Sequence, residues 1–278
     1  MTVSIGTSGF AYDHWRGVLY PEDLRRDQWL SHYASTFPTL ELNVTFYRTP
    51  PKATCEAWRR ATPAHFRFVV KGSRFITHLK RLEDAAEPLK TFFQTVGHLG
   101  AKLSVVLWQL PPGQPADPSR LDRFLTVIGK TLSPRLRWAG RLRHALEFRE
   151  RSWYSDAVYK VLRRHDAALV IADSPYNLVA EGMDTATGPA ETDTIEVPLI
   201  SSWMYLRRHG PDGQIRRSDP EAQLRQYAAA IAAWAKRGDV YVFFNNDPGG
   251  CAVKDAMTLK RLVEPEASVR EPTPRRRA

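Results

Sequence analysis

Short apolar runs that end in polar residues recur along the chain. The clearest is Asp239 to Gly250, in which the apolar run Val240 to Phe244 is followed by Asn245, Asn246 and Asp247, and then by proline and two glycines. This pattern predicts a buried strand that carries polar groups to a turn. Seven other stretches follow the same order of apolar run, polar end, loop and helical pattern. Eight such units in 278 residues predict a closed (β/α)8 barrel, the TIM-barrel class of α/β protein.

The same pattern places the strands and helices. We expect strands at 3–9, 39–46, 66–73, 103–110, 144–149, 167–174, 202–210 and 240–244. The segments between them carry apolar residues at spacings of three and four, as amphipathic helices do. The connection from Pro175 to Ile200 is long and rich in Gly, Thr, Pro and acidic residues. Its length predicts either a functional lid or a poorly ordered segment.

Alternation within the strands indicates which polar residues face the barrel interior. Successive side chains point to opposite faces, and the outer face packs on helices and must be apolar. Because Leu40, Leu42 and Val44 fit the outer face, Glu41 and Asn43 are predicted to point inward. The same reasoning predicts inward positions for Thr7, Lys71, Gln109, Glu147, Arg149, Leu169, Ile171, Asp173, Tyr205, Arg207, His209, Tyr241, Phe243, Asn245 and Asp247.

The polar members of this set lie near the carboxyl-terminal ends of their strands, where the active sites of TIM barrels are found. Turn formation and helix capping would account for residues such as Asn245 and Asp247. They would not account for Glu41, Lys71 or Glu147, which lie within or at the ends of strands. Since burying charge for stability alone is costly, we predict a polar site at this end of the barrel.

Composition and charge add expectations about partners and location. The chain carries a net charge of +10, which favours an anionic partner such as nucleic acid or a phosphorylated metabolite. The two cysteines fit no metal-binding spacing, so neither a disulfide framework nor a cysteine-ligated zinc is expected. No membrane span or secretory signal is evident, and a cytoplasmic protein is expected. Residues 1–263 should form one TIM-barrel domain, followed by a disordered basic tail at 264–278.

Eight motifs along the chain resemble the YecE-like family, a domain of unknown function. They are IGTSGFAYDHWRGVLYP, LELNVTFYRTP, FRFVVKGSRFITH, VLWQLPP, ALEFRERSW, ADSP, YLRRHG and YVFFNND, and the likeness runs from about Ile5 to Leu262. The resemblance implies a TIM-barrel fold and supplies no established reaction. The positions it carries over are Gly6, Ser8, Glu41, Asn43, Lys71, Gln109, Glu147, Arg149, Asp173, Arg207, His209, Gly210, Asn245, Asn246 and Asp247. Two features depart from the family pattern: there is no tyrosine near Ile215, and Asp255 stands where asparagine is usual.

The predicted site suits hydrolysis of a phosphate-bearing substrate, with nucleic acid as one candidate. Lys71, Arg149 and Arg207 would bind its anionic oxygens. The candidate catalytic residues, as acid, base, metal ligand or positioning group, are Glu41, Glu147, Asp173 and His209. The other candidate substrate-binding residues are Ser8, Asn43, Gln109, Asn245 and Asp247. Because His209 is the only histidine expected at an inward strand end, a zinc site with several imidazole ligands is not predicted. The carboxylate oxygens are compatible with a Mg²⁺ or Mn²⁺ site.

Four alternatives stay open on the sequence. In the first, the charged side chains of the site pair with one another and have only a structural role in the barrel interior. Glu147 with Glu41 or Asp173 would form the carboxylate pair of a carbohydrate-active enzyme. Lys71 would act as a Schiff-base amine. Finally, the protein would bind nucleic acid without catalysis, through the surface arginines Arg135, Arg137, Arg141 and Arg143. The oligomeric state is not predicted.

Overall fold

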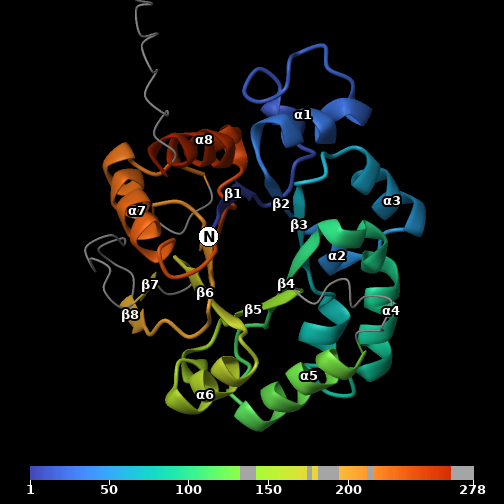
Figure 1. Ribbon diagram of the computed structural model, residues 1–278, viewed down its shortest axis with the longest axis vertical. Coiled ribbons are helices and arrows are strands. Elements are labelled where there is room, and N and C mark those ends of the chain that lie inside the picture. Colours follow the sequence, from blue (N-terminus) through green and yellow to red (C-terminus); the bar gives the residue numbers. More distant parts are fainter. Residues whose placement is uncertain (132–141, 174–176, 181–193, 212–215, 264–278) are drawn as a thin grey trace, which may run out of the picture.

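The described part of the chain forms a near-closed barrel of eight parallel strands surrounded by helices (Figure 1). The computed structural model describes residues 1–131, 142–173, 177–180, 194–211 and 216–263. The strands follow the order β1-β10-β9-β6-β5-β4-β3-β2. The predicted TIM-barrel fold is therefore confirmed. Among the described residues, no helix is long and apolar enough to cross a membrane.

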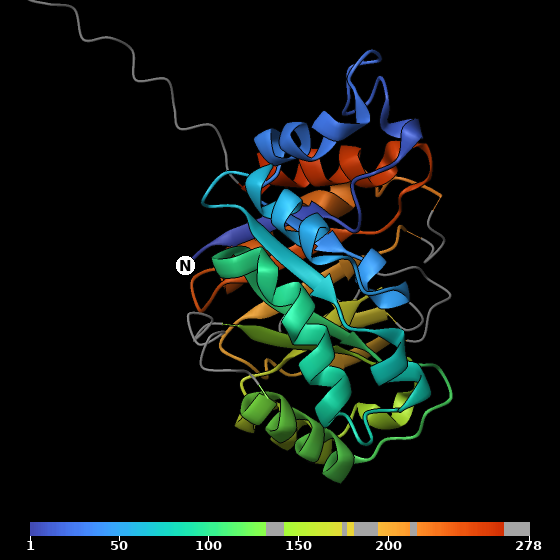
Figure 2. The same cartoon turned by 90° about the vertical axis from the view of Figure 1, so that its right-hand side faces the viewer.

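Each predicted strand is present near its expected position. The barrel strands are β1 (Val3–Thr7), β2 (Thr39–Leu42), β3 (Arg67–Lys71), β4 (Leu103–Gln109), β5 (Arg143–Glu147), β6 (Ala168–Ala172), β9 (Met204–Arg208) and β10 (Val240–Phe244). The helices are α1 (Trp29–Thr36), α2 (Val44–Tyr47), α3 (Lys52–Arg60), α4 (Ala86–Val96), α5 (Pro118–Thr131), α6 (Asp156–Arg164), α7 (Glu221–Trp234) and α8 (Cys251–Val263). Figure 2 shows the barrel from the side, with its strands crossing the molecule and helices packed on the outside.

The second strand is shorter than its sequence predicted. β2 ends at Leu42, and the residues expected to continue it form the short helix α2. The Thr45 hydroxyl lies 2.9 Å from the carbonyl oxygen of Leu42 and 2.6 Å from that of Lys71, so it supports the chain reversal where β2 and β3 end. Asn43 has helical backbone angles and precedes α2. The prediction that Asn43 lies within the strand is therefore wrong.

The connection between β6 and β9 contains two further strands. β7 (Asn177–Ala180) and β8 (Thr194–Val197) pair in parallel as a separate two-stranded sheet. Leu178 and Val197 are buried and belong to the hydrophobic core. The described part of this connection therefore has regular structure. The rest of the predicted lid, at 175–176 and 181–193, lies outside the described residues, as does the predicted tail at 264–278.

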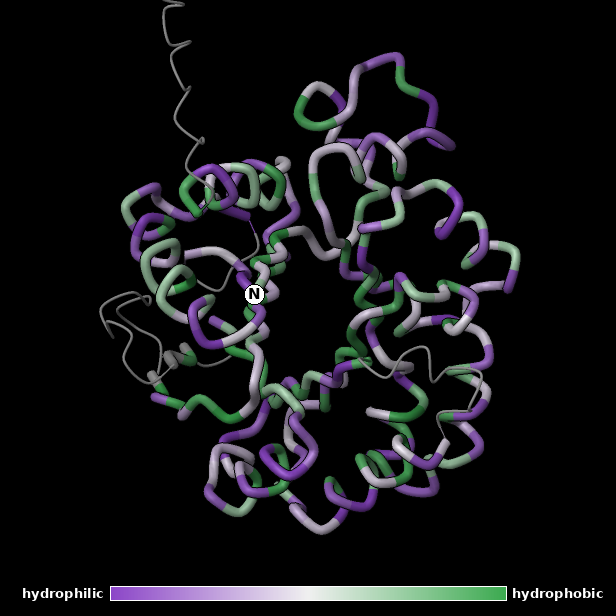
Figure 3. Tube along the Cα trace, viewed as in Figure 1, coloured by the Kyte–Doolittle hydropathy of each residue, from purple (hydrophilic) through white to green (hydrophobic). Residues whose placement is uncertain are grey.

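Two hydrophobic clusters separate the barrel interior from the layer beneath the helices. Figure 3 shows apolar residues concentrated along the strands around the central axis. The interior cluster includes Val105, Leu107, Tyr205 and Phe243, whereas the larger cluster joins the outer strand faces to the helices. The inward positions predicted for Tyr205, Tyr241 and Phe243 agree with this division.

The inward assignment was wrong for β6 and for Thr7 of β1, whose hydroxyl donates to the Tyr33 hydroxyl on α1 at 3.0 Å. Leu169 and Ile171 belong to the cluster that packs on the helices, and Ala168, Val170 and Ala172 face the interior. β6 is apolar at every position, so alternation could not distinguish its two faces. The interior also holds the aromatic rings of β9 and β10, which leave room only for small side chains from β6. The space available therefore decides which face of β6 points inward.

The seam between β1 and β2 is closed by a tyrosine hydroxyl and a narrow backbone contact. The Tyr33 hydroxyl accepts a hydrogen bond from the Thr7 N–H at 2.9 Å and donates one to the Thr39 carbonyl oxygen at 3.0 Å. A Cβ atom at Gly6 would lie 2.3 Å from that same carbonyl oxygen, so only glycine allows this approach. At the carboxyl-terminal end, the Gly9 N–H donates to the Glu41 carbonyl oxygen at 2.8 Å. Tyr33 thus replaces ladder hydrogen bonds where the two strands do not pair directly.

Replacing Tyr33 by phenylalanine is expected to destabilise the fold by about 1–3 kcal/mol, because two buried backbone groups lose their partner. The free energy of unfolding in urea measures the effect. Tyr47→Phe is the control, since the Tyr47 side chain is 76% exposed and its stability should not change. Equal stability of the two variants would show that the Tyr33 hydroxyl does not support the seam.

Candidate functional site

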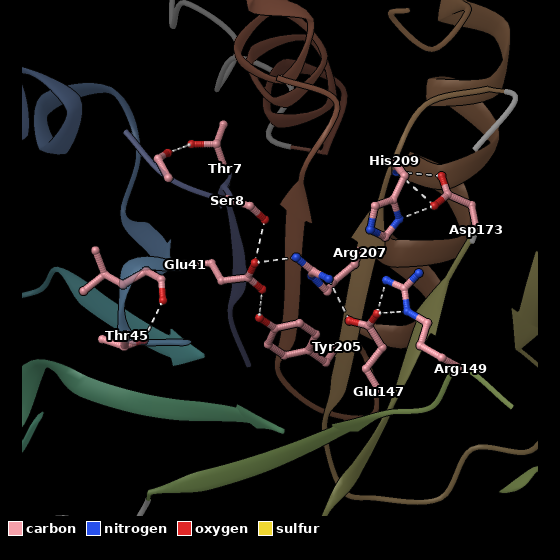
Figure 4. Close-up of polar contacts among 12 residues, drawn as sticks. Thr7, Ser8, Glu41, Thr45, Glu147, Arg149, Asp173, Tyr205, Arg207 and His209 are labelled. Carbon is pink, nitrogen blue, oxygen red and sulfur yellow. Dashed lines mark hydrogen bonds and ion pairs between the residues drawn. The ribbon is translucent and has the colours of Figure 1, made fainter. Parts of the chain in front are cut away.

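A buried guanidinium joins two glutamates across the carboxyl-terminal end of the barrel (Figure 4). Arg207 lies at the end of β9 and is 1% exposed. Its Nη2 donates to Glu41 Oε1 at 2.9 Å, and its Nη1 donates to Glu147 Oε2 at 2.7 Å. Glu41 comes from β2 and Glu147 from β5, and both are buried. Three strands that are distant in sequence therefore contribute to one ion-pair network.

The remaining oxygens of the two glutamates are also occupied. Ser8 Oγ donates to Glu41 Oε1 at 2.6 Å, and the Tyr205 hydroxyl donates to Glu41 Oε2. Arg149 Nε donates to Glu147 Oε1 at 2.7 Å. Burial and the nearby Glu41 carboxylate raise the pKa of Tyr205 well above its ordinary value, so its hydroxyl keeps its proton. All four carboxylate oxygens thus accept at least one hydrogen bond.

The charge of Glu147 is fixed by the cations around it. Burial would raise the pKa of this carboxyl group, but Arg207 and Arg149 outweigh burial and hold the pKa well below its ordinary value. His209 and Lys71 act in the same direction, which places four basic side chains around one carboxylate. Glu147 is therefore ionised near neutral pH, and the geometry favours it as the anchor of the arginines over a role as proton donor.

The predicted Mg²⁺ or Mn²⁺ site is not matched by this arrangement. A divalent ion between Glu41 and Glu147 would have to displace the Arg207 guanidinium that bridges them. Among the described residues, no three histidine, cysteine, aspartate or glutamate side chains lie close enough to hold one ion. As arranged, these two glutamates do not fit a divalent-metal centre.

A second buried pair lies beside the network. Both carboxylate oxygens of Asp173 accept the backbone N–H of His209 at 2.9 Å, and Oδ1 lies 2.7 Å from His209 Nδ1. Burial would raise the pKa of Asp173, but Arg208 and His209 outweigh it and lower that pKa. His209 Nε2 is buried and forms no hydrogen bond with any described residue. The imidazole is therefore oriented by Asp173 through Nδ1 (Figure 4), and its Nε2 is left without a hydrogen-bond partner among the described residues.

Lys71 is the cation of the site that has no direct hydrogen-bond or ion-pair partner among the described residues. Its Nζ lies 4.5 Å from the centre of the Phe46 ring, and no described residue forms a hydrogen bond or an ion pair with it. Burial, followed by the positive charge of Arg207, lowers the pKa of Lys71 to about 8, against the opposing effect of Glu147 and Glu41. Because Arg207 and Arg149 already hold glutamates, Lys71 is the group most available to an anionic ligand.

The other predicted substrate contacts surround this centre with differing roles. Asn43, Gln109 and Asn245 are partly exposed, and Asn43 Oδ1 is a buried atom without a partner among the described residues. Asp247 instead accepts a hydrogen bond from Trp15 Nε1 at 2.7 Å and lies 3.1 Å from His14 Nε2. Burial raises the pKa of Asp247. Asp247 therefore attaches the first loop to the last strand end.

Asn246, one of the positions that match the YecE-like motifs, supports a loop and does not contribute to the centre of the barrel. Asn246 Nδ2 donates to Asp255 Oδ2 at 2.7 Å and to the Arg217 carbonyl oxygen at 2.8 Å. The Asp219 N–H donates to the same Asp255 oxygen at 2.9 Å. Asp255, which departs from the usual asparagine, thus holds the end of the loop before α7. The region near Ile215, where the other departure falls, lies outside the described residues.

Two members of the site were not recognised as such in the sequence. Tyr205 was placed in the interior by alternation, but nothing indicated that its hydroxyl would donate to Glu41. Arg208 faces outward, where Nη2 lies 3.4 Å from Asp173 and the guanidinium also contacts the Tyr227 hydroxyl. An arginine at a position expected to pack on helices was the available signal that it had a buried partner.

Fold and site together define a TIM-barrel-like α/β protein with a buried network of ion pairs at the carboxyl-terminal face. The described strands and helices place every charged member of that network at one end of the barrel. Residues 4–278 match the family described as "Protein of unknown function DUF72", and the chain belongs to this family. The resemblance to YecE-like proteins is therefore confirmed.

Known relatives agree with this assignment along most of the chain. The UPF0759 protein YunF of Bacillus subtilis is 27% identical over 292 residues, which covers 96% of each protein. A crystal structure of a DUF72 family protein from Thermotoga maritima is 25% identical, with a TM-score of 0.71, and covers 95% of this chain and 100% of the other. A D-psicose 3-epimerase from Clostridium cellulolyticum has a TM-score of 0.52 at 10% identity, covering 95% and 96%, and shows a shared fold alone.

Proposed function

We propose that this protein is a hydrolase that acts on a phosphate-bearing substrate at the carboxyl-terminal face of the barrel. The observation that carries the proposal is the Asp173–His209 pair, in which His209 Nε2 is buried and has no hydrogen-bond partner among the described residues. The pair lies beside the ion-pair network, close to Lys71. A carboxylate that orients one imidazole nitrogen leaves the other to accept a proton. In this function His209 accepts a proton from the attacking water and returns it to the leaving oxygen.

In this function the substrate's anionic oxygens bind to Lys71 and to the part of the Arg149 guanidinium that does not contact Glu147. Lys71 has no direct hydrogen-bond or ion-pair partner among the described residues, and Arg149 uses its Nε and one Nη on a single glutamate. Glu41 and Glu147 hold Arg207 in place, so the positive charge does not have to reorganise when the substrate binds. The network thus supports electrostatic stabilisation of a phosphoryl group by groups that are already oriented.

The geometry argues against the carboxylate-pair alternative. Glu41 and Glu147, one of the two carboxylate pairs considered, share one guanidinium, and every oxygen of the two carboxylates accepts a hydrogen bond. A glycosidase needs one protonated and one free carboxyl group on either side of its substrate. The non-catalytic alternative makes a different prediction, since binding would then survive with no turnover. Assays of aryl phosphomonoesters and phosphodiesters with the purified protein decide between hydrolysis and binding alone.

The affinity of the site for sulfate is expected to fall as the pH rises through about 8. The ammonium form of Lys71 predominates below this lowered pKa and the neutral amine above it, so the attraction to an anion is present at lower pH and lost at higher pH. Sulfate serves as the probe because its own charge stays constant over this range. Isothermal titration of the protein at a series of pH values gives the dissociation constants.

Two variants of Lys71 make this measurement specific. Lys71→Arg keeps a charge that does not titrate, so its affinity should stay constant with pH. Lys71→Met should bind sulfate about 10-fold more weakly at neutral pH, with the same lack of pH dependence. A pH dependence that persists in Lys71→Met would assign the titration to another group and contradict the role given to Lys71.

A further inference from the structure

The loops after β2 and β3 form a basic part of the barrel rim. Residues 43–51 and 72–82 contain four lysines and arginines and no aspartate or glutamate, and Glu83 and Asp84 follow directly. Arg48 and Arg74 are exposed, and neither side chain forms an ion pair with a described residue. The rim on this side of Lys71 therefore has the charge that complements a polyanion.

Large apolar side chains are exposed on the same two loops. Tyr47 is 76% exposed, Phe75 48% and Leu79 66%. Among the described residues only Met1 and Met257 are comparable large hydrophobic side chains with exposed surfaces. Phe75 to Leu79 form a π-helical turn, a rare conformation that occurs often at functional sites. Exposed rings beside unpaired arginines are the combination with which proteins bind single-stranded nucleic acid.

Ring contacts connect this rim to the centre of the site. The Phe46 ring lies 5.0 Å from the Tyr47 ring and 5.0 Å from the His78 ring, measured between centroids. The same Phe46 ring carries the Lys71 ammonium at 4.5 Å. A ligand stacked on Tyr47 is therefore separated from the anion-binding lysine by one aromatic side chain.

We propose that the substrate is a single-stranded nucleic acid, whose bases stack on Tyr47 and Phe75 while a backbone phosphate lies at Lys71. The inference rests on the proposed function for the phosphate at Lys71, and adds the chemical class of the substrate. One nucleotide could not contact both exposed rings and also both unpaired arginines, Arg48 and Arg74. These groups therefore favour a nucleic-acid strand over a free nucleotide. Duplex ends and anionic membranes lack unstacked bases and would not use the rings in this way.

Binding of a fluorescent oligothymidylate of about 15 nucleotides tests the proposal by anisotropy at low salt. Tyr47→Ala and Phe75→Ala are each expected to weaken binding roughly 5- to 100-fold, because each ring stacks on one base. Met257→Ala is the matched control, an exposed apolar residue on α8, and should bind as the parent does. The two ring variants replace exposed side chains, and circular dichroism verifies that they are folded.

Each outcome decides for or against the strand. An affinity unchanged by the ring variants, an equal affinity for duplex of the same length, or ring-dependent binding to anionic vesicles in place of the oligonucleotide would overturn the inference. Ring-dependent binding without any cleavage of the strand or of aryl phosphates would support the strand as the ligand of this rim and overturn both the proposed hydrolase and the strand's role as a substrate. Hydrolysis of small phosphate esters by a protein whose oligonucleotide binding does not depend on Tyr47 and Phe75 would do the reverse.

Discussion

Replacing His209 by glutamine is expected to lower kcat on a phosphate ester by about 10²- to 10⁴-fold, the usual contribution of general acid–base catalysis. Glutamine keeps a side chain of similar length that can still hydrogen-bond to Asp173, but its amide cannot act as a proton acceptor near neutral pH. The Michaelis constant should change little, because His209 is not among the proposed anion-binding groups. Steady-state kinetics of the parent and the variant measure both quantities.

His78 provides a matched control on the same rim. Burial, together with the charges of Lys71 and Arg74, lowers the pKa of His78 to about 4, and its Nδ1 lies 2.9 Å from the Thr77 hydroxyl. His78→Gln should therefore retain near-parental turnover. Asp173→Asn should reduce kcat and shift the pH profile of kcat/KM, since it alters the orientation and charge of the imidazole partner. A His209→Gln enzyme with full activity would refute the assignment of the base.

Removing the Arg207 guanidinium should be the most damaging single change to stability in the described structure. Arg207→Met is expected to lower the free energy of unfolding by about 3–5 kcal/mol, because it leaves Glu41 and Glu147 buried without their shared cation. Urea denaturation at neutral pH measures the loss. Arg74→Met is the control, since that exposed side chain forms no ion pair with a described residue and its removal should cost little.

The pH dependence of this loss has a defined sign. The pKa of Glu147 is lowered in the folded protein, so the stability that its ion pairs contribute is present above the ordinary value of 4.5 and is lost as the pH falls through the lowered folded value. In Arg207→Met, Glu147 loses the cation that contributes most to lowering its pKa and takes up a proton more readily, so the difference from the parent should shrink as the pH falls to about 4.5 and below. Adding Glu41→Gln and Glu147→Gln to Arg207→Met should restore part of the lost stability. A loss that is the same at all pH values would contradict the ion-pair explanation.

The arrangement of the barrel could be predicted from the sequence because most strands show an unambiguous outer face. In β5, the apolar Leu146 and Phe148 fix the inward direction of Glu147, and the structure agrees. β6 failed because its five residues are all apolar, and only the volume of neighbouring rings decides which face is inside. β2 ended early because the Thr45 hydroxyl can bind strand-end carbonyls, a local contact that alternation does not report.

The partners within the site could not be predicted. Alternation indicated that Glu41, Glu147 and Arg207 share the interior, but their pairing depends on distances across the barrel between residues far apart in sequence. The sequence likewise indicated Asp173 and His209 as site residues without showing that the Asp173 carboxylate contacts both the backbone N–H and the ring Nδ1 of His209. Such pairings arise from three-dimensional position, whereas sequence periodicity specifies only direction.

The seam beside Tyr33 has a consequence for the order in which the protein can be completed during synthesis. β1 forms its full ladder with β10, near the other end of the sequence, whereas it forms no ladder with β2 and meets it at Tyr33, at the close approach of Gly6 and at the bridge between Ser8 and Glu41. A growing chain folds from its N-terminus. The first strand to leave the ribosome, β1, therefore keeps an unpaired edge until β10 has been made. A chain that stops short of Val240 would expose the edges of β1 and β9 to other protein molecules.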